Sequence, residues 1–232
     1  MKVAIVAGGL GSRMGQLTNA VPKPMLEVFG KPILEHLLVW LRSANFKGIS
    51  LCLGYRSEAV SRYFQDGKKW GIDLNYHIEK NPRGTAGCVR DLMGDSSEDV
   101  LVVYGDLFIK MDIDPFLKFH QSRSNAAASL VLFATDHPQD SDLVHMRADK
   151  ITDFYRDPKA LPPHHLSCAA VWIVRKSLIN LIPTDASSDF GRDIFPAALK
   201  ANLTLSGYVT KENLVDLGTP ERLSTFTQGE NR

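Results

Sequence analysis

The sequence has no excess of charge of either sign. Its 232 residues include 27 lysines and arginines against 26 aspartates and glutamates, which gives a formal net charge of +1. A balanced charge provides no general attraction for nucleic acid or for an anionic membrane, so any bound anion must meet local positive charge. We therefore expect small-molecule substrates and no nucleic-acid partner.

Cysteine is scarce, and long apolar runs are absent. Cys52, Cys88 and Cys168 are odd in number and far apart, so they form neither a metal-binding spacing nor a disulfide framework. This usage favours a reducing compartment, and we expect a cytoplasmic location. No stretch approaches the roughly 18 apolar residues of a transmembrane helix. The first residues run into glycines instead of a cleavage site, so we expect neither membrane insertion nor a signal peptide.

Apolar runs of strand length alternate with amphipathic stretches in the first half of the chain. Strands are predicted at 2–7, 49–53, 74–78 and 100–104, and helices at 33–43, 58–64 and 86–93. This order predicts an α/β fold with a Rossmann-like, mainly parallel sheet flanked by helices. The second half is less regular, with strands predicted at 127–134, 143–146, 151–155, 167–174 and 206–210 and a helix at 194–200.

A glycine-rich loop directly follows the first predicted strand. Gly8, Gly9 and Gly11 allow a sharp turn and close approach to a ligand, and consecutive N–H groups in such a loop form an anion-binding concavity. Arg13 adds a guanidinium suited to phosphate oxygens. Lys23 adds a point charge between two prolines that restrict the chain on both sides. These features together favour a triphosphate site over a tight turn with surface charges.

Two common glycine loops are excluded by their spacing. The dinucleotide motif G-x-G-x-x-G would need a glycine at position 14, where Met14 stands. The phosphate-binding motif G-x-x-x-x-G-K-[ST] does not occur. The loop is therefore of another type.

The whole set of motifs resembles the nucleotidyltransferases that activate sugar 1-phosphates. The chain reads A-G-G-L-G-S-R-M at 7–14 and P-K-P-M-L-E-V-F-G-K-P-I-L-E-H at 22–36. Three further matches follow in the family's order, at 79–87 (E-K-N-P-R-G-T-A-G), 103–106 (V-Y-G-D) and 215–220 (V-D-L-G-T-P). The resemblance covers residues 1 to 222, and the compact length is most similar to heptose 1-phosphate guanylyltransferases and N-acetylmuramate 1-phosphate uridylyltransferases.

The resemblance implies Mg²⁺ as cofactor and roles for specific residues. Asp106 and Asp216 would be the metal pair, although a turn or helix-cap aspartate is the alternative for each. Arg13, Lys23 and Asp106 are the expected catalytic residues, since the reaction brings two anions together. The expected nucleotide-binding residues are Ala7, Gly8, Gly9, Gly11, Arg13, Lys23, Glu79, Gly84, Thr85 and Asp106. A solvated glutamate at a strand end is the alternative for Glu79.

The acceptor half departs from the family pattern. Arg156 and Asp157 stand where F-x-E-K-P has glutamate and lysine, and Cys168 replaces a sugar-contacting asparagine. We assign no sugar-binding role to Asp157 or Cys168, and we consider Arg156 a candidate for the missing positive charge. Asp189 and Arg192, in a stretch similar to D-F-x-x-D-x-[FL]-P, are further acceptor candidates, with a helix-start cap as the alternative.

These observations predict one domain over residues 1–232, with a nucleotide-binding part at about 1–110 and an acceptor-binding part at about 111–222. The expected reaction is nucleotidyl transfer from an NTP, with GTP the first choice, to a sugar 1-phosphate such as a heptose 1-phosphate. Two alternatives stay open. One is a CTP-type enzyme for a phosphorylated amino acid or amino alcohol, and the other is a non-catalytic nucleotide sensor. The sequence does not decide between a monomer and a homo-oligomer.

Overall fold

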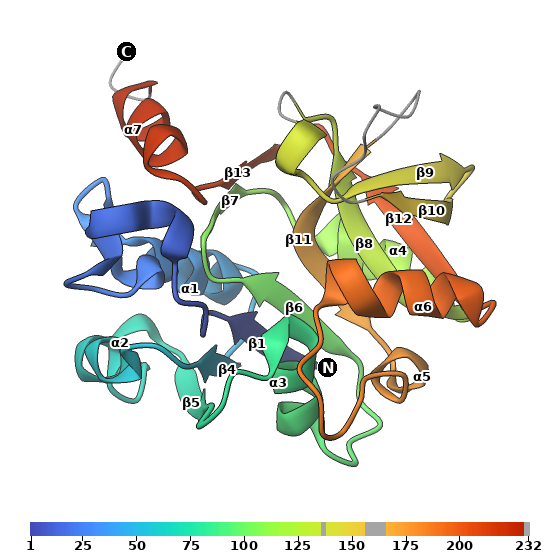
Figure 1. Cartoon of the computed structure of the whole chain (residues 1–232), viewed down its shortest axis with the longest axis horizontal. Coiled ribbons are helices and arrows are strands. Elements are labelled where there is room, and N and C mark those ends of the chain that lie inside the picture. Colours follow the sequence, from blue (N-terminus) through green and yellow to red (C-terminus); the bar gives the residue numbers. More distant parts are fainter. Residues whose placement is uncertain (136–137, 156–165, 230–232) are drawn as a thin grey trace. The chain divides into compact units, whose positions relative to one another are not determined.

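The computed structural model describes residues 1–135, 138–155 and 166–229. The chain divides into two compact units, each drawn from separate stretches of sequence (Figure 1). The glycine-loop unit comprises Val3–Pro82, Val103–Met111 and Asn213–Arg232. The second unit comprises Met1–Lys2, Arg83–Val102 and Asp112–Glu212. The single domain with a division near residue 110 stays a prediction.

Parallel strands form the sheet of the glycine-loop unit. Its order runs from β5 (Asp73–Ile78) through β4 (Gly48–Leu53) to β1 (Lys2–Val6), and both pairings are parallel. At the centre of β1, Val3, Ala4 and Ile5 are at most 2% exposed. Such continuous apolar runs are typical of parallel strands covered on both faces. The predicted strands and their parallel arrangement are confirmed here.

Helices and short elements complete the glycine-loop unit. They are η1 (Ser12–Thr18), η2 (Lys23–Met25), β2 (Glu27–Val28), β3 (Lys31–Pro32), α1 (Ile33–Ser43), α2 (Ser57–Phe64), η3 (Lys68–Trp70), β7 (Leu107–Lys110), β13 (Asn213–Asp216) and α7 (Pro220–Gly229). Helix α1 spans the residues predicted for it, because its apolar side chains recur on one face and are buried there. Among the described residues, none of the helices combines the length and apolarity that crossing a bilayer requires.

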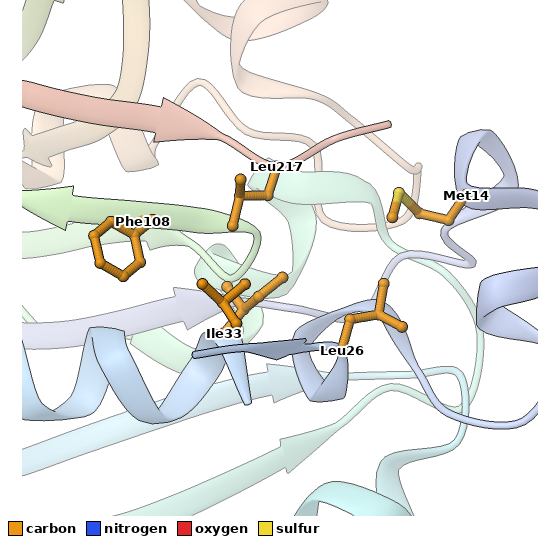
Figure 2. Close-up of a cluster of buried hydrophobic side chains, with 6 residues drawn as sticks. Met14, Leu26, Ile33, Phe108 and Leu217 are labelled. Carbon is orange, nitrogen blue, oxygen red and sulfur yellow. The ribbon is translucent and has the colours of Figure 1, made fainter. Parts of the chain in front are cut away.

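A buried apolar cluster joins segments that are distant in the sequence. Met14, Leu26, Ile33, Phe108 and Leu217 pack together in the glycine-loop unit, as Figure 2 shows. Three of these side chains adjoin predicted site residues along the chain, namely Met14 beside Arg13, Phe108 near Asp106, and Leu217 beside Asp216. Burial of one such side chain stabilises the fold by about 1.5–3 kcal/mol. The cluster therefore fixes the backbone from which the candidate site projects.

The second unit contains more regular structure than its sequence indicates. Its elements are α3 (Gly84–Met93), β6 (Val100–Tyr104, whose last residues belong to the glycine-loop unit), α4 (Asp114–Ser122), β8 (Ala126–Phe133), η4 (Pro138–Asp140), β9 (Leu143–Arg147), β10 (Lys150–Tyr155), β11 (Leu166–Val174), α5 (Lys176–Ile179), η5 (Phe190–Ile194), α6 (Phe195–Lys200) and β12 (Thr204–Val209). The strand order β11-β8-β12-β10-β9 contains one parallel pair, β12 with β8. Its other pairings are antiparallel. Strands β9 and β10 must pair this way because only Ala148 and Asp149 join them.

A buried histidine links helix α4 to strand β8 and to two connecting segments of the second unit. His120 of α4 is 2% exposed, and its Nδ1 lies 2.8 Å from Ser129 Oγ of β8. Its Nε2 lies 3.1 Å from Asp99 Oδ2, and the Arg175 guanidinium also contacts that oxygen at 3.6 Å. Burial, together with the charge of Arg175, lowers the pKa of His120 below its ordinary value of 6.5, although Asp99 opposes this shift.

We expect this histidine to make stability fall under mildly acidic conditions. Well above pH 6.5 the ring is neutral in both the folded and the unfolded chain. Below that pH the unfolded chain takes up a proton that the folded chain does not. The free energy of unfolding then falls, by at most about 1.4 kcal/mol per pH unit, until the pH reaches the lowered pKa. Urea unfolding of the wild type and His120→Gln at pH 7.5, 6.5 and 5.5 measures this effect. Equal pH slopes in the two proteins would contradict it.

Candidate functional site

The glycine loop is shaped by close packing between two strand ends. Ala7 N donates to Cys52 O at 2.9 Å, and this bond continues the pairing of β1 and β4. A Cβ on Gly8 would lie 3.1 Å from Gly54 N, and a Cβ on Gly54 would lie 2.8 Å from Gly8 O. Real Cβ atoms do not approach backbone oxygens so closely, so this contact requires glycine at Gly54. The loop can therefore turn away from the sheet within a few residues.

The loop then turns through Gly11 into η1. Gly11 has a φ of 65°, in the left-handed region that favours glycine, and its carbonyl accepts from Met14 N at 2.8 Å. The Thr18 hydroxyl lies within 3.3 Å of the carbonyl oxygens of Gly11 and Gly15. Gly9 and Arg13 are both exposed. The backbone and the guanidinium are thus accessible to a ligand, as a triphosphate site requires.

Lys23 forms an ion pair with the first of the two predicted metal-binding aspartates. Its Nζ lies 2.5 Å from Asp106 Oδ2, and the two side chains are 10% and 23% exposed. The flanking Pro22 is extended, and Pro24 continues the short helix that begins at Lys23. The lysine is therefore held in place by its backbone and by its partner, and it brings positive charge to the carboxylate.

Antiparallel strands place the two aspartates side by side. Strand β7 begins directly after Asp106, and its first residue, Leu107, pairs with Asp216, the last residue of β13. The connection is closed by Leu217 N, which donates to Asp106 O at 3.0 Å. Two carboxylates that are distant in the sequence thus end on neighbouring backbone positions. The structure brings together the predicted metal pair.

One oxygen of Asp216 is satisfied and the other is not. Oδ2 accepts from Arg222 Nη1 at 2.7 Å. Oδ1 is buried and has no hydrogen-bond partner among the described residues. A carboxylate oxygen removed from water without a donor is costly unless something else compensates it. A cation bound at Oδ1 would supply that compensation.

The groups around Asp216 have opposing effects on its pKa. Burial, and next the negative charge of Asp106, raise the pKa of Asp216 above its ordinary value. The positive charges of Lys23, Arg222 and Arg13 oppose this shift. Two neighbouring carboxylates amid three cationic side chains are suited to bind a divalent cation and a polyanion together. Groups of three or more His, Cys, Asp or Glu side chains able to hold a metal are absent from the part of the chain described. The remaining ligands would thus come from phosphate and water, as Mg²⁺ commonly requires.

Glu79 adjoins the glycine loop. Its backbone N donates to Leu53 O at 2.8 Å, which continues the pairing of β4 with β5. Its Oε2 would lie 2.8 Å from a Cβ on Gly8. The carboxylate is therefore beside the loop, where the nucleotide-binding prediction requires it, and its contact with a base stays a prediction.

The second unit holds another set of predicted residues. The Thr85 hydroxyl donates to Asp189 Oδ2 at 2.7 Å and accepts from Phe190 N at 3.1 Å. Asp189 Oδ1 accepts from Arg192 N at 3.0 Å at the start of η5, so the cap interpretation of Asp189 is confirmed. The structure thus brings Thr85, Asp189 and Arg192 together. Their roles toward nucleotide or acceptor stay predictions.

Gly84 and Arg192 have clear local environments in this unit. Gly84 has a φ of 73°, and a Cβ there would collide with Ser188 O, so the close approach it permits is to protein backbone. Arg192 is 62% exposed and lies 3.1 Å from Asp193. Arg156 and Asp157 lie outside the described residues. Cys168 is partly exposed on β11, and its N donates to Asp142 O at 2.8 Å.

Two residues of the glycine-loop unit were not identified from the sequence. Gly54 could have been found, because it follows the buried strand β4 as Gly8 follows β1. Arg222 had no comparable signal, since an arginine in the first turns of a helix is usually a solvated charge. Its contact with Asp216 depends on the direction that α7 takes after the turn that follows β13.

Comparison with known proteins agrees with this site. The model of the nucleotidyl transferase family matches residues 2–231. The mannose-1-phosphate guanylyltransferase of Mycobacterium tuberculosis is 30% identical over 220 residues, which make up 94% of this chain and 61% of that protein. The D-glycero-alpha-D-manno-heptose 1-phosphate guanylyltransferase of Campylobacter jejuni is 25% identical over 225 residues, covering 95% of this chain and 96% of that protein. The chain thus spans about three fifths of the mycobacterial relative's length.

Solved structures agree on the fold. HddC from Yersinia pseudotuberculosis, complexed with GMP-PN, is similar with a TM-score of 0.80 at 23% identity, and the match covers 99% of each chain. The predicted α/β class, a central sheet flanked by helices, is therefore confirmed. Because the family model spans nearly all of the sequence, this chain belongs to the nucleotidyl transferase family.

Proposed function

We propose that this protein transfers the nucleotidyl group of an NTP to a sugar 1-phosphate and releases pyrophosphate. The observation that carries the proposal is the pairing of Asp106 with Asp216 beside Lys23, with Asp216 Oδ1 buried and unpartnered. Relatives named as guanylyltransferases of mannose 1-phosphate and heptose 1-phosphate support this reaction class. A relative named as a UTP–glucose-1-phosphate uridylyltransferase extends it to another base.

The chemistry requires neutralisation of charge. An oxygen of the acceptor phosphate forms a bond to the α-phosphorus of the NTP, and the bond from that phosphorus to the bridging oxygen breaks. Both reactants are anions, so stabilising the charge that spreads over the phosphoryl oxygens should dominate catalysis. Lys23 and the exposed Arg13 supply fixed positive charge. No covalent intermediate is required, because holding the two reactants in line is sufficient.

Nucleotidyltransferases of this family generally use a divalent metal ion. We propose Mg²⁺, held by Asp106 and Asp216, because oxygen ligands from two carboxylates and from phosphates are those it prefers. When bound, it would supply positive charge to the phosphates. Lys23 contacts Oδ2 of Asp106, and Arg222 contacts Oδ2 of Asp216. The Oδ1 atom of each aspartate would then be available to the ion.

The glycine loop would bind the nucleotide. Ala7, Gly8, Gly9 and Gly11 present backbone groups, and Glu79 lies beside Gly8 as an acceptor for donors of a base. Gly84 and Thr85, from the second unit, belong to the same proposal by their place in the family segment. We propose GTP as donor, because the mycobacterial and Campylobacter relatives are named as guanylyltransferases.

The acceptor assignment depends on different residues. We propose a heptose 1-phosphate, by analogy with the Campylobacter relative whose length matches this chain. Asp189 and Arg192 of the second unit are acceptor candidates, and Arg156 is a third. The departures at Arg156, Asp157 and Cys168 motivate the alternative of a phosphorylated amino acid or amino alcohol with CTP.

Pyrophosphate release across a panel of substrates tests the proposal. GTP, UTP, CTP, ATP and dTTP are each combined with heptose, mannose and glucose 1-phosphates and with phosphocholine, with Mg²⁺ or with chelator. We expect Mg²⁺-dependent release that requires a sugar 1-phosphate and is fastest with GTP. Release only with phosphocholine and CTP would favour the alternative acceptor. Tight NTP binding without release from any pair would favour a nucleotide sensor and overturn the proposal.

A further inference from the structure

Arg222 contacts the proposed metal site through the carboxylate of Asp216. Its Nη1 donates to Asp216 Oδ2 at 2.7 Å, and the arginine side chain is 17% exposed. Nothing in the reaction proposed above requires a cation at this oxygen. The contact nevertheless determines which oxygen of Asp216 stays available.

The backbone on both sides of this contact is fixed. Strand β13 holds Asp216 through its pairing with Leu107. Helix α7 is held by Leu223 and Phe226, which pack on the apolar cluster of Figure 2. The first turn of α7 is closed by Thr219, whose Oγ1 accepts from Arg222 N at 3.3 Å. The guanidinium therefore extends from a fixed backbone next to the fixed backbone of Asp216.

The other oxygen of Asp216 is restricted by the turn that follows. A Cβ on Gly218 would lie 2.6 Å from Oδ1, so glycine here leaves room for this oxygen in its present position. Oδ1 is buried and without a hydrogen-bond partner in the described part of the chain. Turning the carboxylate plane away from this orientation would move its oxygen out of reach of Arg222 and break the hydrogen bond. The arginine and the glycine turn together define one orientation.

We propose that Arg222 is a positioning residue, which holds Oδ2 of Asp216 and so leaves Oδ1 for a divalent cation. Carboxylates that ligate metals are commonly oriented by such hydrogen bonds, and removing the partner costs about 10- to 100-fold in metal affinity or activity. The inference rests on the proposed function, because that function places the cation at Asp106 and Asp216.

A purely electrostatic role predicts the opposite sign. If Arg222 only added positive charge near the site, its removal would make the site more negative and bind a cation more tightly. If Arg222 only met the nucleotide, its removal would leave cation binding to the free protein unchanged. Metal affinity without nucleotide therefore separates positioning from both of these roles.

The test is a Mn²⁺ titration of the free protein, read by the electron paramagnetic resonance signal of unbound Mn²⁺. Arg222→Met is compared with the wild type, with Arg222→Lys and with Arg62→Met, which removes the same charge from an exposed position on α2. The Mn²⁺ binding that is lost in Asp216→Asn is the part that occurs at the proposed metal site. We expect Arg222→Met to weaken Mn²⁺ binding about 10-fold or more. We expect Arg222→Lys to fall between Arg222→Met and the wild type, and Arg62→Met to bind as the wild type does.

Unchanged or tighter Mn²⁺ binding by Arg222→Met would overturn the inference, as would a wild type that binds no Mn²⁺ through Asp216. If Arg222→Met unfolds at a lower temperature than the wild type, Arg222→Lys is the deciding variant, because it keeps the positive charge. Weaker Mn²⁺ binding by Arg222→Lys than by the wild type would support positioning. Mn²⁺ binding by Arg222→Lys equal to that of Arg62→Met would overturn it. Mn²⁺ binding needs no turnover. A protein that binds Mn²⁺ as expected but releases no pyrophosphate would contradict the proposed function and leave the role of Arg222 supported.

Discussion

Replacing Asp106 by asparagine is expected to lower the turnover of nucleotidyl transfer about 10³-fold. The change keeps the size of the side chain but removes the negative charge that pairs with Lys23 at 2.5 Å and adjoins Asp216. A bound metal ion contributes several kcal/mol to stabilising transition-state charge, and each 1.36 kcal/mol corresponds to about tenfold in rate. Loss of about 4 kcal/mol therefore gives the stated effect. The measurement is steady-state pyrophosphate release at saturating substrates.

A matched change shows whether the effect is specific. Asp73→Asn removes the same charge from an exposed position at the start of β5 and should keep wild-type turnover. Thermal unfolding of Asp106→Asn should show a folded protein, because Asp106 is partly exposed and asparagine can still accept a hydrogen bond from Lys23. Turnover of Asp106→Asn within tenfold of the wild type would contradict a metal role for this carboxylate.

Replacing Lys23 by methionine should lower turnover about 10²- to 10³-fold, the effect of removing one preorganised donor from a transition state. The side chain is buried, and Pro22 and Pro24 restrict its backbone, so that the charge is held in one place. Its loss also leaves Asp106 and Asp216 more negative. Metal binding should therefore be kept or strengthened while catalysis falls, which distinguishes Lys23 from the carboxylates.

The assay measures kcat and the Mg²⁺ concentration for half-maximal rate in Lys23→Met and in Lys47→Met, a change at an exposed lysine. We expect kcat to fall in Lys23→Met without an increase in the Mg²⁺ requirement, and we expect Lys47→Met to behave as the wild type does. A normal kcat with a raised Mg²⁺ requirement would show that Lys23 serves only to orient Asp106.

Much of the glycine-loop unit could be predicted from local patterns. The run from Val3 to Ala7 is apolar and is followed by glycines, and such runs are typical of buried parallel strands. Helix α1 followed from the spacing of its apolar residues, which bury one face. These features depend on a few neighbouring residues, so the sequence contains their signal.

The pairing of Asp106 with Asp216 has no local signal. It depends on two four-residue strands, β7 and β13, which are too short to show a periodic pattern. From the residues alone, a turn or helix-cap aspartate stayed an alternative at each position, and only the resemblance to a family joined the two. The contact of Arg222 with Asp216 was missed for the same reason, since the packing of Leu223 and Phe226 on the apolar cluster decides it.

Resemblance was less informative for the second unit. Its segment at Gly84 and Thr85 matches the family, yet Thr85 binds Asp189 and Gly84 packs on Ser188 O within this unit. The motif identifies Gly84 and Thr85 as part of a family segment, but only the structure shows the contacts that these two residues make within the protein. The antiparallel pairing of β9 with β10 likewise follows from the short connection between them. The periodicity of apolar residues along the sequence does not reveal such a pairing.

A crystal structure with GTP and Mn²⁺, in which anomalous scattering locates the metal, tests most directly whether Asp106 and Asp216 form the metal site. We expect a Mn²⁺ ion bound by carboxylate oxygens of both Asp106 and Asp216 and by phosphate oxygens of the nucleotide, with Lys23 close by. An ordered nucleotide whose Mn²⁺ contacts neither aspartate would contradict this expectation.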